Sequence, residues 1–251
     1  MKNFFMFETE YPAGSGFVPF GPCHLIWLFC IAVFTGITAY WYKNQEEEGQ
    51  RKAEHVLGIL FPVIAVYRDL VLMLTGHFSK GFLPFHLCSM ALWIAVIYIW
   101  TKNRFWGIIY VLLCVPGAAG ALLFPNWDAY PFFNYMHIHG FFSHGLIVAF
   151  GIWLIAAGRV IPCWRDFWMP VVFGIVGFFI IHWLNGMLGT NFWFLDNPSH
   201  GSPLVWILGI TGERGYRAGY FLFCMAVVAA WQGMLDFTCR LLTQKKNLQS
   251  K

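Results

Sequence analysis

Residues 168–189 read WMPVVFGIVGFFIIHWLNGMLG, a run of 22 residues without a lysine, arginine, aspartate or glutamate. A transmembrane helix needs about 20 consecutive, mostly apolar residues, because the hydrocarbon core of a bilayer is about 30 Å thick. A helix on the surface of a soluble protein would carry a charged face, and this stretch has none. It therefore predicts a helix that crosses a membrane.

Six further apolar stretches of similar length lie around it in the sequence. They cover residues 22–42, 56–76, 83–100, 105–124, 139–157 and 216–235. Of all residues, 59% are hydrophobic and 11% are charged, whereas a soluble domain carries about 25% charged residues. The sequence therefore predicts an all-α, polytopic membrane protein. Its single transmembrane domain, residues 1–251, is expected to be a bundle of seven transmembrane helices.

Positive charges are distributed unequally between the loops. Most lysines and arginines fall after the first, third and fifth predicted helices and in the C-terminal tail. The opposite side has only Lys2, Lys80, Arg214 and Arg217. Because cytoplasmic loops carry the excess of lysine and arginine, we predict an outside N-terminus, a cytoplasmic C-terminus and a multi-pass location in the cell membrane. The net charge of +4 thus reports topology, and we expect membrane lipids, and no nucleic acid, as partners.

Two of the predicted loops stand out. Residues 46–54 between the first two helices contain a run of charges, for which a solvated loop is the expected structure. The last outer loop, residues 190–215, contains the apolar run from Leu204 to Ile210, which is too short to span a bilayer. We predict that this run forms a re-entrant or interfacial half-helix over the outer mouth of the bundle.

Polar residues from five of the predicted helices fall at one depth, within about two and a half turns of an outer helix end. They are His24, Arg68, Asp69, His86, Ser89, His144, His182 and Asn185. A charge inside a membrane costs roughly 2.5 to 3.5 kcal/mol, so Arg68 and Asp69 should face the bundle interior. Neighbours on a helix point apart, so each is expected to find its partner on another helix. The layer is either a structural network or a ligand or catalytic cavity.

The segment 83–89, LPFHLCS, is expected to open the third helix, with Pro84 in its first turn. On such a helix His86 and Ser89 share a face, whereas Cys88 points almost oppositely. A nucleophilic Cys88 would then need its base from another helix. The alternative is that the cysteine is only a small apolar residue.

Residues 137–145, HIHGFFSHG, bring three histidines to the fifth predicted helix. Zinc would require three ligands and usually carboxylates behind them, but Asp69 and Asp128 are the only acids expected nearby. We therefore predict no metal and no other cofactor. A general-base or hydrogen-bonding role suits His144 better, given its depth and its polar neighbours.

Three groups of residues carry a resemblance to a known family. They are Leu83 to Cys88, Ser143-His144-Gly145, and Gly189-Thr190-Asn191 followed by Phe194-Leu195 and Pro198. Together they resemble the YwaF-like bacterial integral membrane proteins, over essentially all seven helices. The wider family has a eukaryotic branch associated with moving acyl chains between phospholipids through a cysteine and a histidine. The resemblance implies an acyltransferase or lipase-like activity and singles out His86, Cys88, His144, Thr190 and Asn191.

Two functions from different classes are therefore expected. In the first, an enzyme acts on an acyl lipid: Cys88 or a water attacks the ester, and His144 or His86 is the base. In the second, a transporter or binding protein holds a small solute or a lipid headgroup without catalysis. In the enzyme, Asn191 or Arg68 would stabilise the oxyanion or the phosphate. The substrate-binding residues expected from the sequence are Arg68, Asp69, His182, Asn185 and Asn191.

The predicted orientation can be tested by cysteine labelling in a background from which the seven native cysteines have been removed. In intact cells an impermeant thiol reagent is expected to modify a cysteine placed at Ser202 and to spare one placed at Gln244, because positive charges mark the cytoplasmic side. The reverse labelling pattern would show that the topology is inverted.

Overall fold

The computed structural model describes residues 2–249, and it describes side chains for residues 3–238. Within that part of the chain all regular structure is helical. The long helices are α1 (Pro22–Lys43), α2 (Glu47–Leu74), α3 (Leu87–Thr101), α6 (Tyr135–Ala156), α7 (Trp168–Leu188) and α8 (Leu204–Gln249). Another long helix consists of α4 (Arg104–Ile109), the π-helical turn η4 (Tyr110–Cys114) and α5 (Val115–Leu123). Short 3-10 helices are η1 (Lys2–Phe5), η2 (Glu8–Glu10), η3 (Lys80–Phe82), η5 (Trp164–Asp166) and η6 (Phe192–Phe194).

The described helices include six that are long and apolar enough to cross a membrane. They cover residues 22–43, 47–74, 104–123, 135–156, 164–188 and 204–238, and α3 is a shorter apolar helix. The chain is thus an all-helical, polytopic membrane protein, as the sequence predicts. The count of seven crossings and the orientation stay predictions. The labelling position Gln244 lies outside the residues whose side chains are described.

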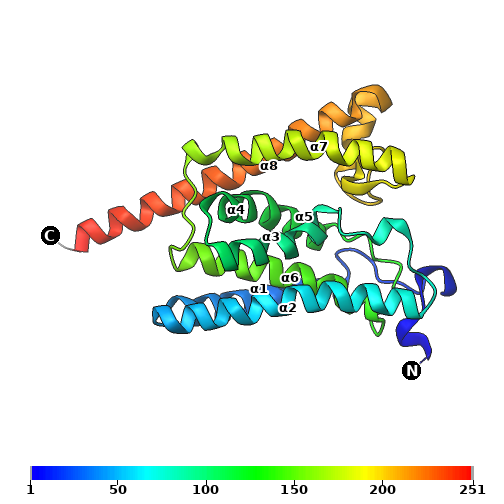
Figure 1. Cartoon of the computed structure of the whole chain (residues 1–251), viewed down its shortest axis with the longest axis horizontal. Helices are drawn as coiled ribbons and strands as arrows, with labels where there is room; N and C mark the ends of the chain where they lie inside the picture. Colours follow the sequence, from blue (N-terminus) through cyan, green and yellow to red (C-terminus); the bar gives the residue numbers. More distant parts are fainter. Residues whose placement is uncertain (1, 250–251) are drawn as a thin grey trace.

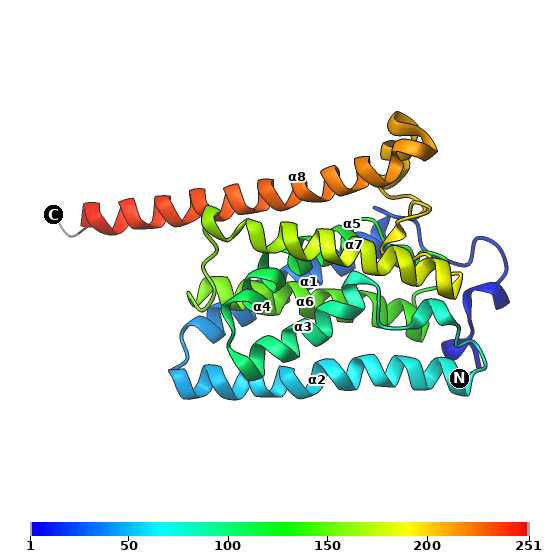
Figure 2. The same cartoon turned by 45° about the horizontal axis from the view of Figure 1, so that its top comes forward.

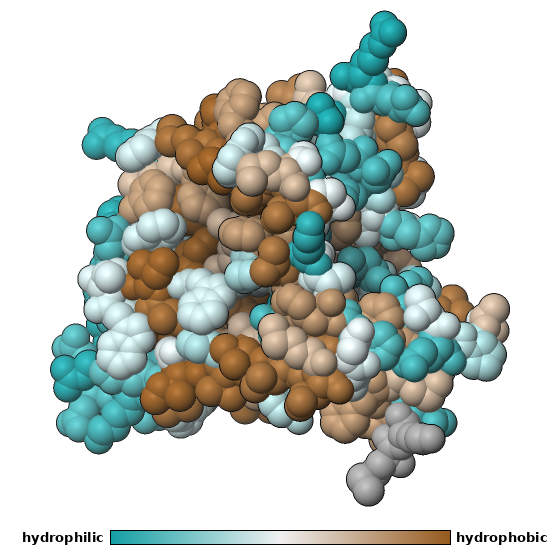
Figure 3. Space-filling view, turned by 45° about the vertical axis from the view of Figure 1, so that its right-hand side comes forward, coloured by the Kyte–Doolittle hydropathy of each residue, from teal (hydrophilic) through white to brown (hydrophobic). Residues whose placement is uncertain are grey.

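The helices form layers that run side by side. Figure 1 and Figure 2 show α7 and α8 on one side of the molecule, α2 on the other, and α3 to α6 between them. Large apolar side chains are exposed on the outer helices, such as Phe29 of α1, Leu74 of α2 and Phe179 of α7. Figure 3 shows apolar residues reaching the surface over much of the visible face. Since soluble proteins rarely expose such large apolar surfaces, these are the faces that meet lipid.

The charged run at residues 46–54 is helical rather than a loop, which corrects the expectation from sequence. α2 begins at Glu47 instead of residue 56. Glu47 and Glu48 lie in its first turn, where a carboxylate is favoured by the helix dipole. Glu48 also pairs with Lys52 one turn later, at 2.7 Å. These local interactions let the helix continue beyond the apolar stretch.

The segment expected to open the third helix is not helical. α3 begins at Leu87 instead of residue 83, and His86 is its N-cap residue. The guanidinium of Arg68 donates a hydrogen bond of 2.7 Å to the carbonyl of Phe82, which holds the preceding segment against α2. Pro84 therefore lies in a turn before the helix. His86 has extended dihedrals (φ −66°, ψ 144°), so helix spacing does not set its direction relative to Cys88.

The short apolar run after α7 is helical, as predicted, and a break follows it. Gly212 has φ +65° and ψ 173°, which ends the first two turns of α8 and starts the long part of the helix. Figure 2 shows the short turns folded back at the end of α8. A Cβ on Gly219 would lie 2.8 Å from the Thr211 side chain and 2.9 Å from that of Ile207. Glycine thus allows the two parts of α8 to touch.

Replacing Gly219 by valine is expected to push these two parts of α8 apart. Overpacking of this kind costs about 1 to 3 kcal/mol, so the free energy of unfolding should fall and the thermal midpoint in detergent should decrease. Gly209→Val is the matched control, since nothing lies within 4 Å of a Cβ at that position. Equal midpoints for the two variants would show that the close approach does not exist.

Candidate functional site

A cavity of about 940 Å³ lies between α3, α5, α6 and α8. Phe82, Phe124 and Ser202 border one end, and Ile152 and Met234 line the part toward the other end. We call these the outer and inner ends after the predicted orientation. Most lining residues are apolar, and the polar side chains gather toward the outer end. Pockets of this size and composition are typical of sites for organic ligands. We refer to this space as the cavity.

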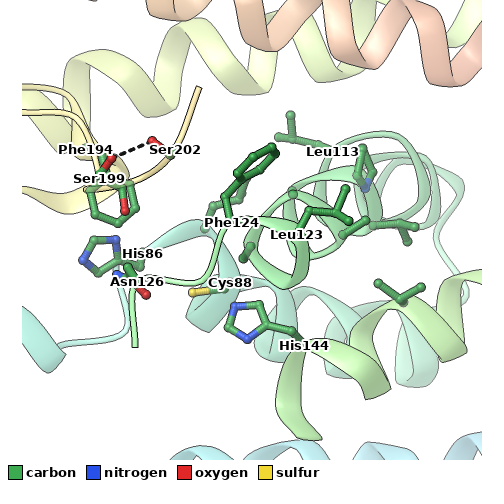
Figure 4. Close-up of a pocket in the computed structure, with 18 of the residues that line it drawn as sticks. His86, Cys88, Leu113, Leu123, Phe124, Asn126, His144, Phe194, Ser199 and Ser202 are labelled. Atoms are coloured by element: carbon green, nitrogen blue, oxygen red, sulfur yellow. Dashed lines mark hydrogen bonds between the residues drawn. The ribbon is translucent and has the colours of Figure 1, made fainter. Parts of the chain in front are cut away.

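Cys88 of α3 and His144 of α6 meet in the cavity. The Cys88 thiol and the His144 imidazole lie next to each other and interact, and Figure 4 shows the two side chains side by side. The Nδ1 of His144 lies 2.7 Å from the carbonyl oxygen of Gly140. A carbonyl can only accept, so Nδ1 carries the proton and the neutral ring has an unprotonated Nε2. That nitrogen can accept the thiol proton, which is the arrangement of a nucleophile and its general base.

The His144 ring is held on its face as well as at its edge. Trp127 stacks on it with ring centroids 4.9 Å apart and an interplanar angle of 19°. A Cβ on Gly140 would lie 2.6 Å from the Trp127 ring, so only glycine lets the indole come this close. Gly140 therefore positions His144 in two ways: its carbonyl accepts the Nδ1–H bond, and its lack of a side chain lets Trp127 stack on the ring. The ring is fixed in the orientation that keeps Nε2 toward the sulfur.

Arg68 and Asp69 pair with each other, contrary to the expectation from helix geometry. The Arg68 Nε and Nη2 donate to the same Asp69 oxygen at 2.9 and 2.7 Å. The arginine side chain is long enough to bend back over its own helix, which Cα directions alone do not reveal. Arg68 also reaches α3, as expected, through a 3.2 Å hydrogen bond to Ser89 Oγ. Arg68 and Ser89 line the cavity, and Asp69 lies behind the arginine.

The histidines of α1 and α6, together with His86 before α3, divide into two sets. His86 and His139 line the cavity with His144, and the His86 ring lies between those of Phe192 and Phe194, each at 5.2 Å. Among the described residues, no group of three or more histidine, cysteine or acidic side chains is placed to hold a metal ion. Some of these histidines therefore line the cavity, and others belong to a structural hydrogen-bond network.

The structural network is formed by His24 and His137. His24 accepts the Phe20 N–H at 2.8 Å and donates to the Leu122 carbonyl at 2.7 Å. His137 accepts the Trp27 indole N–H at 2.9 Å. Both imidazoles thus have both nitrogens engaged or directed at the backbone, and they join α1 to α5 and α6.

Besides Asp69, three residues expected to bind substrate lie outside the cavity lining. Asn185 is buried and holds the loop after α7, since it accepts the Phe192 N–H at 2.8 Å and donates to the Phe192 carbonyl at 3.1 Å. Asn191 bonds within the same loop, to the Asn197 carbonyl at 2.8 Å. His182 is 45% exposed, and its Nδ1 is 4.0 Å from Asp196. The polar stripe of α7 faces this loop rather than the bundle centre.

Several cavity residues give no signal in the sequence. Trp127 and Asn126 come from the loop after α5, and Trp231 comes from α8. Their approach depends on tertiary packing, which periodicity does not report. Gly140 could have been found, because it lies four residues before His144 and therefore on the same helix face. Phe194 has φ +55°, an uncommon backbone conformation for an aromatic residue.

Comparison with known proteins identifies one family. The model of the TMEM164 family matches residues 19–235, which include α1 to α7 and most of the described part of α8. No curated protein matches the chain, and no solved structure matches it. The family match therefore rests on sequence over nearly the whole bundle.

Replacing Gly140 by alanine is expected to displace Trp127 and to loosen His144. Misplacing a catalytic group by about 1 Å can reduce its effect by up to 10²-fold, so alkylation of Cys88 by a small membrane-permeant maleimide should slow roughly tenfold. The rate would be followed by mass spectrometry of the Cys88 peptide. Gly120→Ala is the control, since Gly120 lines the cavity with nothing within 4 Å of a Cβ. Equal rates in both variants would contradict the proposed support of His144.

Proposed function

The chain belongs to the TMEM164 family, and we propose that this multi-pass membrane protein transfers or hydrolyses the acyl chain of a lipid through Cys88. The observation that carries the proposal is the placement of the Cys88 thiol beside the His144 imidazole at the polar end of an otherwise apolar cavity. A nucleophile with a base in such a place suits an ester whose acyl chain is apolar. The resemblance to the YwaF-like proteins, with their acyl-transferring eukaryotic branch, supports the same chemistry.

The first half of the reaction transfers the acyl group to the protein. The Cys88 sulfur attacks the ester carbonyl carbon while its proton passes to Nε2 of His144. The tetrahedral intermediate collapses, the bond between the carbonyl carbon and the alcohol oxygen breaks, and Nε2 returns the proton to that oxygen. A lysolipid leaves, and the acyl group stays on Cys88 as a thioester. The Nδ1–H bond to the Gly140 carbonyl persists throughout.

The second half reverses these roles with a new acceptor. The acceptor hydroxyl gives its proton to Nε2 as its oxygen attacks the thioester carbonyl carbon. The bond between that carbon and sulfur breaks, the acyl group leaves on the acceptor oxygen, and the Cys88 thiolate takes the proton back from Nε2. With a second lysolipid as acceptor the reaction is acyl transfer, and with water it is hydrolysis. The apolar lining around Cys88 limits access of water, which favours transfer.

Positive charge near the outer end suits the polar part of a lipid. Arg68 is partly buried and lines the cavity. Its hydrogen bonds to Asp69, Ser89 and the Phe82 carbonyl offset the free-energy cost of burying its charge. A guanidinium in a place of low dielectric attracts a phosphate or a developing oxyanion strongly. Figure 4 shows His86 and Asn126 on the side of Cys88 away from His144, where further donors for the substrate oxygens would lie. With the predicted orientation, this end of the cavity opens to the outside of the cell membrane.

The proposal predicts that Cys88→Ala and His144→Ala abolish acyl transfer and hydrolysis. General acid–base catalysis contributes about 10² to 10⁴-fold, so the His144 variant should lose at least about 10²-fold in turnover of a labelled phospholipid by the purified protein. His200→Ala is the control, because His200 is exposed and lies outside the cavity lining. A lost buried hydrogen bond costs only about 1 to 3 kcal/mol, so all variants should remain monodisperse.

Three other outcomes have defined meanings. If His144→Ala keeps full turnover while Cys88→Ala loses it, the base lies elsewhere. If both variants keep full turnover, the cysteine–histidine mechanism is wrong. If the parent protein shows no turnover, the cavity serves binding or transport of a lipid headgroup or small solute.

A further inference from the structure

The cavity continues well beyond the Cys88–His144 pair along α6. Gly140, His144, Val148 and Ile152 follow one another at every fourth residue, and all of them line it. Residues four apart share one helix face. Ile152 lies about 12 Å below His144 along the helix axis, at 1.5 Å per residue. The side chains below His144 on this face are purely apolar.

The opposite wall is formed by one face of α8. Tyr220, Phe223, Val227, Trp231 and Met234 line the cavity at spacings of three or four residues. From Tyr220 to Met234 the helix rises about 21 Å. That is more than half of the hydrocarbon core, which is about 30 Å thick in total. The cavity is thus longer than the depth of one leaflet.

Trp231 is the one large side chain in this inner wall whose position is fixed by a hydrogen bond to the facing helix. Its indole N–H donates to the carbonyl of Val111 at 2.9 Å. Val111 belongs to the π-helical turn η4, which precedes Pro116, and Leu113 of the same turn lines the cavity. Because this bond joins α8 to η4, the indole is held in the wall of the inner part of the cavity and cannot swing freely.

We propose that the inner part of the cavity holds one long acyl chain, with its methyl end at Trp231, and that Trp231 sets the chain length presented to Cys88. The inference rests on the proposed function for the position of the ester at Cys88. A longer chain would meet the indole and push its ester out of reach of the sulfur. A shorter chain would leave an unfilled space beside Trp231 and lose packing contacts. Van der Waals fit, rather than escape from water, provides the selectivity, because the competing solvent is lipid.

Chain-length profiles test the role of Trp231. Purified protein is given phosphatidylcholines with short, medium, long and very long acyl chains, and thioester formation on Cys88 is followed by intact mass. The parent is expected to prefer one length class. For each variant we compare the rate with the next longer class of chain to the rate with the class that the parent prefers. Trp231→Phe and Trp231→Ala should raise this ratio roughly tenfold, as other changes in apolar pockets do. Ile152→Phe should shift the preference to shorter chains.

The matched control for these variants is Trp183→Ala. Trp183 is an exposed tryptophan of α7 outside the cavity lining, so its loss should leave the profile unchanged. If Trp231→Phe, which keeps most of the ring, and Trp231→Ala both retain the profile of the parent, Trp231 does not set the chain length and the inference fails.

A second measurement separates this inference from the proposed reaction. This measurement needs no turnover and uses the Cys88→Ala variant. A phosphatidylcholine with a diazirine at the methyl end of one long chain is bound and photolysed, and the crosslinked peptides are identified. Crosslinks to peptides with Ile152 or Trp231 support the acyl-chain site, even if the parent never forms a thioester and the proposed reaction fails. Crosslinks confined to outer faces, such as Phe179 of α7, overturn the inference whatever the turnover.

Discussion

A bilayer supplies no hydrogen bonds, so every polar side chain in the membrane must find its partner within the protein. The outer half of the bundle is organised by this constraint. His24 bonds to the Leu122 carbonyl, Arg68 to Asp69 and Ser89, and Asn185 to the loop after α7. Other polar side chains face the cavity. The Cys88 thiol and the unprotonated Nε2 of His144 are among them, and these two groups interact with each other.

The cavity exists because small residues and a helix irregularity face α8. Gly117 and Gly120 of α5 line it, and a Cβ on Gly120 would touch nothing within 4 Å. The π-helical turn η4 joins α4 to α5, and its Val111 carbonyl accepts a hydrogen bond from the Trp231 indole N–H. The cavity is therefore bordered on one side by glycines, which leave space, and on another by an aromatic ring that is held in place. Both features keep an apolar space open beside the cysteine.

Much of the fold and part of the site could be predicted from the sequence. Uninterrupted apolar runs identify the helices, and the cost of a membrane charge places Arg68 inside the bundle. The sequence also indicates that a base for Cys88 would come from another helix, and His144 of α6 lies beside it, although its role as a base stays a proposal. The Arg68–Asp69 pair could not be predicted, because it depends on how a flexible side chain bends. Likewise, helical periodicity places His182 and Asn185 on one face of α7 but does not tell which neighbour that face contacts. Asn185 contacts the loop after α7 instead of the cavity.

The placement of Cys88 on α3 and of Gly140 and His144 on α6 has a consequence for biogenesis. The two helices are separated in the chain by α4 and α5, so the thiol meets its base only after the intervening helices have inserted and packed. A nascent or misassembled chain carries an ordinary cysteine and an ordinary histidine, neither of which is activated. In the proposed reaction, the reactive thiol therefore forms only late in assembly. A cell that makes this protein is spared a nucleophile among its lipids until the bundle that confines it is complete.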